Sequence, residues 1–392
     1  MEPIFETIHT YIDGQHEAML KLWEELVNTE SGSRNLEGVA AVTDILRREM
    51  EATGMRTKVL PVDNAAGVLV GEWNWESDKA PLIFLGHMDT VFPDGTVAKN
   101  PFRVDEEGFA HGPGVLDMKP GLVIGLFAIR ALAAAGWKER PIKCVFAGDE
   151  ENLHMFSNAK QVLQQEAQGA LAAFNFETGF LDDSFVVGRK GGGPVRLTVH
   201  GVSAHSGNAP EKGRSAILEA ARKVVELEAC NDLEAGRLLN CGKITGGIGE
   251  NTIPDQCVVQ IGLRFNTTAQ KDELIAALEQ AAANNTVADT WSELDTSRLM
   301  ECMDTTPGVT ALFEHLKQTA LDCGYGPITS CRVGGLSDSG LTVSSGVPTV
   351  CGMGVKGEGN HTPTECAQVE SLYSRCVLAA CAAATLQDSF AG

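Results

Sequence analysis

Several features that would mark other functional classes are missing from this sequence of 392 residues. Basic residues are scarce: 31 Lys and Arg stand against 52 Asp and Glu, a formal charge of −21, and they form no clusters. Nucleic acids and anionic membranes attract proteins through such clusters, so we predict that neither is a partner. No apolar run is long enough to cross a bilayer.

Targeting and disulfide signals are missing as well. The first residues, Met1-Glu-Pro-Ile-Phe-Glu, contain early acids and no basic segment followed by an apolar one, so no secretory signal is predicted. The eleven cysteines include no Cys-x-x-Cys pair, which disfavours a thiolate zinc site. We therefore expect reduced thiols and a cytoplasmic location.

The length and the patterning predict two domains, because 392 residues exceed what one ordinary core supports. Strand-like runs alternate with helical patterns, which predicts an α/β fold with a mainly parallel sheet and helices on both faces. The composition changes at Gly191-Gly-Gly193, which we interpret as a hinge. We predict one domain from residues 1–192 and 304–392, and a smaller α+β (ferredoxin-like) domain inserted as residues 193–303.

Each expected element is defined by its apolar periodicity. The expected helices cover residues 3–28, 35–53, 119–135, 157–167, 213–229, 269–284, 307–323 and 367–386. The expected strands cover residues 57–60, 66–73, 81–86, 142–147, 171–176, 195–200, 239–246, 256–265 and 347–351.

The segment Pro81–Thr90 carries the first sign of chemistry. Its apolar run predicts a buried strand that ends at His87, with Asp89 two residues later. An imidazole at the carboxyl end of such a strand is a candidate metal ligand, and the carboxylate can accept the other ring N–H. Alone, the pair is weak evidence, because a histidine beside an aspartate at a strand end is more often a satisfied polar contact.

Five further residues lie at the ends of other expected strands or at the start of a helix. Asp117 follows a Gly-rich loop, Glu150 and Glu151 follow one strand, Glu177 closes another, and His361 follows a third. Each has an ordinary interpretation: a helix N-cap for Asp117, a solvated acidic turn for the glutamates, a surface loop for the last two. Together they converge on one edge of a parallel sheet. Nitrogen and oxygen ligands in this number favour two divalent metals, roughly 3.5–4 Å apart, that share a carboxylate.

These motifs resemble a known family over almost the whole chain: the zinc-dependent peptidases that include glutamate carboxypeptidase, aminoacylase, succinyl-diaminopimelate desuccinylase and tripeptide aminopeptidase. The likeness is strongest to the glutamate carboxypeptidase-like branch. It is carried by five motifs: His87-Met-Asp-Thr-Val91, Gly112-Pro-Gly114 with Asp117, Asp149-Glu-Glu151, Gly188-Arg-Lys-Gly191 and Ser203-Ala-His-Ser-Gly207.

The resemblance implies a ligand set for two zinc ions per subunit, which cobalt or manganese could replace. Asp117 would bridge the ions, His87 and Glu177 would complete the shell of one, and Glu151 and His361 that of the other.

Further roles follow from the same resemblance. Glu150 would be the general base, and Asp89 would orient the metal-binding histidine beside it. The family also implies a cis peptide bond after the bridging aspartate, here Asp117–Met118. Met118 departs from the polar residue that close relatives often carry, and we expect no disturbance of the ligands.

The inserted domain is implied to act as a lid and to form a homodimer. His205 would come from the partner subunit and stabilise the oxyanion, although the sequence alone favours an ordinary loop histidine. Asn251 and Arg264 match positions that meet the substrate, and Arg332 is assigned to the substrate cleft. The fork of an arginine suits a carboxylate, but a surface ion pair explains Arg264 equally well.

The predicted activity is hydrolysis of the amide bond to a C-terminal amino acid in a small peptide, with glutamate as the first candidate. An N-acyl-amino-acid amidohydrolase or a dipeptidase on the same scaffold is the alternative, since all of these products carry a free carboxylate. A binding protein that has lost its metals is a remote alternative, because every ligand position and Glu150 hold residues of the right chemistry.

Overall fold

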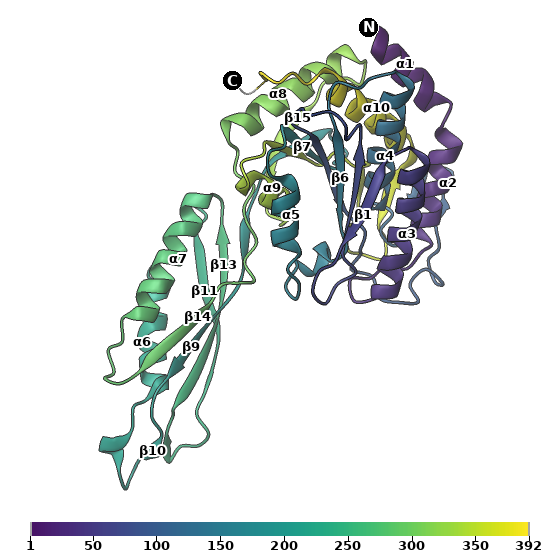
Figure 1. Cartoon of the computed structure of the whole chain (residues 1–392). Coiled ribbons are helices and arrows are strands. Elements are labelled where there is room, and N and C mark those ends of the chain that lie inside the picture. The colour runs from purple at the N-terminus through teal and green to yellow at the C-terminus, as the bar shows by residue number, and fades with distance from the viewer. Residues whose placement is uncertain (1, 391–392) are drawn as a thin grey trace. The chain divides into compact units, whose positions relative to one another are not determined.

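An eight-stranded sheet forms the centre of the larger of two units in this computed structural model, which describes residues 2–390 (Figure 1). In order across the sheet, the strands are β1 (Arg56–Leu60), β2 (Val68–Trp73), β6 (Ile142–Ala147), β3 (Leu82–His87), β7 (Ala172–Asn175), β16 (Thr349–Cys351), β8 (Ser184–Arg189) and β15 (Thr329–Val333). The central strands β6, β3, β7 and β16 run parallel. Strands β2 and β8 are antiparallel to β6 and β16. The prediction of an α/β fold with a mainly parallel sheet is confirmed.

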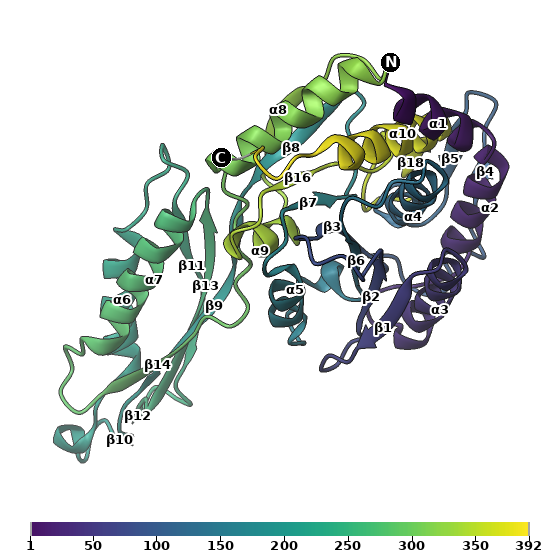
Figure 2. The same ribbon diagram turned by 45° about the horizontal axis from the view of Figure 1, so that its top comes forward.

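Helices cover both faces of this sheet, as predicted (Figure 2). Around α4 (Lys119–Ala134) and α10 (Val369–Thr385) pack α1 (Pro3–Asp13), α2 (His16–Val27) and α8 (Pro307–Asp322). Two other helices, α5 (Ala159–Ala167) and α9 (Ser339–Ser344), pack on the opposite face, and α3 (Leu36–Ala52) packs on β1 and β2. Helix α4 is buried almost all round because nearly every residue in it is apolar or glycine. It therefore holds the segment that precedes it firmly against β3.

A small antiparallel sheet lies in the same unit. Its strands, in order, are β17 (Gly357–Glu358), β18 (Cys366–Gln368), β5 (Phe109–His111) and β4 (Arg103–Val104). The sheet pairs the segment that leads to Asp117 with the segment that contains His361, although the two lie far apart in the sequence.

The second unit comprises residues 189–304 with 334–336. Its elements follow in the order β9 (Gly191–His200), α6 (Ala216–Glu228), β11 (Leu238–Gly246), β13 (Gln256–Phe265), α7 (Thr268–Ala283) and β14 (Trp291–Asp295). The sheet order is β11-β13-β9-β14 and all its pairs are antiparallel. A βαββαβ chain with this order is the ferredoxin-like arrangement that the sequence predicts. Its core lies between the sheet and the two helices.

The three glycines interpreted as a hinge are instead the first residues of β9, where they pair with Phe265, Arg264 and Leu263 of β13. A Cβ at Gly191 would approach the Phe265 ring to 2.1 Å, so the absence of a side chain there allows close approach to β13. The units change at 188/189 and 304/305, a few residues from the expected boundaries.

Other differences concern the ends of elements. The expected helix at 3–28 is two helices, since the chain turns at Gly14 and Gln15. Strands β8, β14 and β15 were not expected, and none of them is a long apolar run. All eleven cysteines lie among the described residues, and each is free. Within residues 2–390, no helix has the length and apolar character needed to span a membrane.

Candidate metal centre

The carboxyl ends of the parallel strands place the candidate ligands at one edge of the large sheet. His87 is the last residue of β3, a strand in which every residue is buried. Glu150 and Glu151 begin a short 3₁₀ helix, η1 (Glu150–Asn152), three residues after β6 ends. Glu177 follows β7 by two residues, and His361 lies in the loop between β17 and β18. The convergence predicted from strand ends is therefore what the fold produces.

Two groups of possible ligands share one residue. His87, Asp117 and Glu177 have ligand-type atoms that all lie within 4.8 Å of one another, as do those of Asp117, Glu151 and His361. Asp117 is common to both groups, and its two oxygens face different histidines. Oδ1 lies 3.2 Å from Nε2 of His87, and Oδ2 lies 3.2 Å from Nε2 of His361. A carboxylate held in this way can contact two cations at once.

Asp89 is completely buried and contacts several of the residues at this edge of the sheet. Its Oδ1 lies 3.4 Å from Nδ1 of His87, so the other ring nitrogen, Nε2, faces Asp117. The same carboxylate accepts the backbone N–H groups of Glu150 and Glu151, both at 3.1 Å, and the Ser33 hydroxyl at 2.6 Å. Asp89 therefore fixes the histidine and also the two neighbouring glutamates, a second role that the sequence did not suggest.

The protonation of the cluster follows from its burial and crowding. Burial raises the pKa of Glu150, and although the positive charge of His87 opposes this, Glu177 and other carboxylates raise it further. Burial alone would lower the pKa of His87, but contacts with Asp117 and Asp89 bring it well above its ordinary value. Hydrogen bonds to Asp117 and Glu151 raise the pKa of His361 to about 10. The raised pKa of both histidines thus reflects the excess of carboxylates around them.

The residues fit a divalent metal pair. Among residues 2–390, Oε1 of the half-buried Glu151 has no hydrogen-bond partner, although it is shielded from solvent. Several carboxylates buried around two histidines are costly unless cations balance them. Imidazole nitrogens and carboxylate oxygens suit zinc and related ions. The donor set therefore fits divalent metal ions.

The peptide bond Asp117–Met118 is cis, as the resemblance implied. Met118 is fully buried, and its sulfur accepts the backbone N–H of His87 at 3.2 Å. The methionine side chain thus packs in the core against the backbone of His87.

Several residues that support the ligands have no recognisable signal in the sequence. The buried ring of His154 forms hydrogen bonds with Asp149 and with Asp338, each at 2.7 Å. These bonds connect the turn after β6 to the start of α9. Glu365 accepts the backbone N–H of Asp117 at 3.1 Å, and Asn360 donates to Oδ2 of Asp117 at 3.0 Å. These contacts join residues far apart in the chain, so no local pattern announces them.

The predicted substrate residues divide between the units. His205, Asn251 and Arg264 belong to the second unit, where Ser206 donates to the backbone oxygen of Asn251 and brings the first two together. Nδ1 of His205 accepts the N–H groups of Gly207 and Asn208, which leaves Nε2 as the donor of the neutral ring. Arg332 lies on β15 of the first unit.

Comparison with known proteins finds a matching family and several relatives of this chain. A family model described as Peptidase family M20/M25/M40 matches residues 83–385. Carboxypeptidase G2 of Pseudomonas sp. (strain RS-16) is 27% identical over 369 residues, which cover 93% of this chain and 88% of that protein. Succinyl-diaminopimelate desuccinylase of Dechloromonas aromatica (strain RCB) is 29% identical over 253 residues, which cover 60% and 65%.

The fold agrees with these relationships. The crystal structure of aminopeptidase PepT from Bacillus cereus ATCC 10987 matches with a TM-score of 0.69 at 22% identity, and the match covers 94% of this chain and 97% of that one. The family model spans most of the chain, from β3 to the end of α10. The chain therefore belongs to the peptidase family M20/M25/M40 and is a hydrolase of the metallopeptidase class, as its motifs predicted.

Proposed function

We propose that this chain is a dinuclear zinc hydrolase that cleaves the amide bond to a C-terminal amino acid, with glutamate as the first candidate. The observation that carries the proposal is Asp117, whose two oxygens face two separate groups of possible ligands. In this proposal His87 and Glu177 complete one metal shell, and Glu151 and His361 complete the other. Similarity to carboxypeptidase G2 over 93% of the chain supports release of a C-terminal residue.

In this proposal, one residue beside the metals transfers the proton and another holds it in position. Two bound divalent ions would polarise the scissile carbonyl and lower the pKa of the attacking water. Glu150, the general base, accepts the proton of that water and passes it to the leaving nitrogen. Its carboxylate lies outside both groups of possible ligands, within 3.9 Å of Nε2 of His87, so it is free to hold a proton between two steps. Asp89 keeps both His87 and Glu150 in place.

The second unit contributes the remaining groups of the proposal, as a lid and as a dimerisation domain. Asn251 and Arg264, together with Arg332 of the first unit, bind the substrate. His205 donates from Nε2 to the oxyanion, and it does so in the partner subunit of a homodimer. Exposed apolar side chains on the second unit, Val225, Leu233 and Ile248, supply surface that a partner could cover. We place the enzyme in the cytosol, where its free thiols stay reduced.

A related activity has support of its own. Similarity to succinyl-diaminopimelate desuccinylase favours hydrolysis of an N-acyl amino acid on the same metals. A panel of N-acyl amino acids, dipeptides and peptides that end in glutamate separates the two activities by their relative kcat/KM.

Metal content tests the proposal directly. The purified chain should bind two zinc ions, lose hydrolysis after chelation, and regain it with zinc or cobalt. Because the neighbouring carboxylates raise the pKa of His87 and of His361, zinc has to compete with protons for both rings. Addition of zinc near neutral pH should therefore release protons, and zinc affinity should fall as the pH falls. Elemental analysis and titration in a weakly buffered solution measure both effects. Hydrolysis that survives exhaustive chelation would refute the proposal.

The homodimer is tested by complementation between two inactive variants. Glu150→Gln and His205→Ala should each be inactive, and both should elute at twice the 41.7 kDa mass of one chain. If His205 acts in trans, a mixed dimer has one intact site. Co-expression should then recover about a quarter of the parent activity, since half of the dimers are mixed and each has one working site. Absence of recovery, or an active monomer in light scattering, contradicts the trans arrangement.

A further inference from the structure

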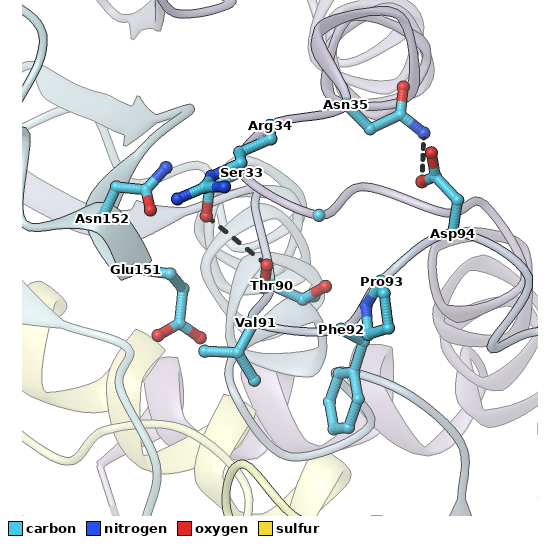
Figure 3. A pocket seen from close by; sticks show the side chains of 11 residues that line it. Ser33, Arg34, Asn35, Thr90, Val91, Phe92, Pro93, Asp94, Glu151 and Asn152 are labelled. Carbon is cyan, nitrogen blue, oxygen red and sulfur yellow. Dashed lines mark hydrogen bonds between the residues drawn. The ribbon is translucent and has the colours of Figure 1, made fainter.

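A cavity of about 510 Å³ opens beside Glu151 in the first unit, and the metal centre explains only one side of it (Figure 3). Its walls come from the turn that precedes α3, the segment that follows β3, and the start of η1. This volume lies in the range of small-molecule sites. Because Glu151 belongs to one of the two ligand groups, a molecule in the cavity would lie next to the centre where the amide bond is cleaved.

Arg34 is the one cationic side chain in the wall of this cavity. Figure 3 shows it reaching from the turn before α3 toward Asn152 and Glu151. Arg34 is exposed to solvent, and within residues 2–390 its guanidinium forms neither an ion pair with a carboxylate nor a hydrogen bond. In a chain with 52 acids and 31 bases, acidic partners are plentiful, yet this arginine faces the cavity without one.

Besides Glu151, the cavity wall contains one other carboxylate, and it already has a hydrogen-bond partner. Asp94 accepts a hydrogen bond from Nδ2 of Asn35 at 2.7 Å, on the side of the cavity away from Arg34 (Figure 3). Oδ1 of the same asparagine caps α3 by accepting the N–H of Gly38 at 2.8 Å. Asn35 is therefore fixed at both ends, so Asp94 is held where it is. Beside these polar groups, Phe92 gives the cavity an apolar wall that suits the methylene groups of a ligand.

We infer that Arg34 determines specificity by pairing with a carboxylate on the substrate. A guanidinium offers two parallel N–H donors that match a carboxylate, and a lysine at the same place would keep only the charge. The carboxylate belongs either to the side chain of the released amino acid or to the acyl group, and the chemistry of recognition is the same. The inference rests on the proposed function, since it takes the neighbouring centre to be the site of hydrolysis.

The test uses pairs of substrates that differ only in a carboxylate and its amide, with the zinc-loaded full chain. One pair is N-acetylglutamate and N-acetylglutamine, and the other is N-succinylalanine and N-succinamoylalanine. The ratio of kcat/KM for acid over amide should fall roughly 10- to 100-fold in Arg34→Ala, in one of the two pairs. Arg34→Lys should fall between the parent and Arg34→Ala. The pair that responds identifies which carboxylate is bound.

Arg47→Ala is the matched control, since Arg47 lies on α3 and does not line the cavity. It should leave both ratios at the parent value. If Arg34→Ala also leaves both ratios unchanged, Arg34 is only a solvated surface residue and the inference is overturned. Equal losses on acid and amide, with unchanged ratios, overturn it in the same way.

A binding measurement separates this inference from the proposed function. If the parent chain hydrolyses none of the four compounds, the proposed function fails for this substrate class, and calorimetric titration with glutarate and butyrate decides the role of Arg34. Glutarate should then bind more tightly than butyrate, and Arg34→Ala should remove that preference. Equal binding of the two acids to the parent chain, or a preference that survives in Arg34→Ala, rejects the inference.

Discussion

The Glu150→Gln variant should lose about two to four orders of magnitude in kcat while it retains the zinc content of the parent chain. Glutamine keeps the size of the side chain but cannot accept the proton of the attacking water. Glu150 lies outside both groups of possible ligands, although its carboxylate comes within 3.9 Å of Nε2 of His87. Its backbone is held by Asp89 through the N–H group, which the substitution leaves in place. Steady-state kinetics together with elemental analysis measure the two quantities.

The neighbouring residue supplies the matched control. Glu151→Gln removes a member of the second ligand group in the same turn, so both activity and bound zinc should fall. The two variants differ by one position and by no other chemistry. A Glu150→Gln chain that loses zinc as well would show that Glu150 is a ligand, and the general base would have to be sought elsewhere.

The centre of the large sheet could be predicted from the sequence because its strands are apolar runs with polar residues at their carboxyl ends. The strand before His87 is buried throughout, and parallel pairing with β6 and β7 brings Glu150 and Glu177 to the same edge. Neither the pairing order nor any distance was needed for that prediction. The motif resemblance then supplied the roles of the individual residues.

The residues that support the ligands could not be predicted in this way. His154 bonds Asp338, 184 positions away, and Glu365 reaches the backbone of Asp117 across 248 positions. Such contacts follow from the packing of loops that have no periodic pattern. Similarly, Gly191 suggested flexibility, whereas its lack of a side chain is needed for close approach to Phe265. A glycine allows both backbone flexibility and close packing, and only the fold shows that close packing is required at this position.

The Asp117→Asn variant should lose both zinc ions, rather than one, and its hydrolysis should fall to the background rate. One oxygen of Asp117 faces His87 and the other faces His361, so a single substitution weakens both groups. An asparagine presents only one oxygen, and its NH₂ group cannot bind a cation. It also places a donor beside one of the histidines. Bound zinc per chain, measured after gel filtration, should therefore fall from two toward zero.

Single-group variants provide the contrast that makes this result informative. Glu177 belongs only to the first group and His361 only to the second. Glu177→Gln and His361→Ala should each retain about one zinc ion, because the other group keeps its three members. All of the variants should keep the far-ultraviolet circular dichroism of the parent chain. If Asp117→Asn retains one zinc ion, or if loss of either outer ligand removes both, the two groups do not share Asp117 as separate sites. The separate roles proposed for His87 and His361 then fail with it.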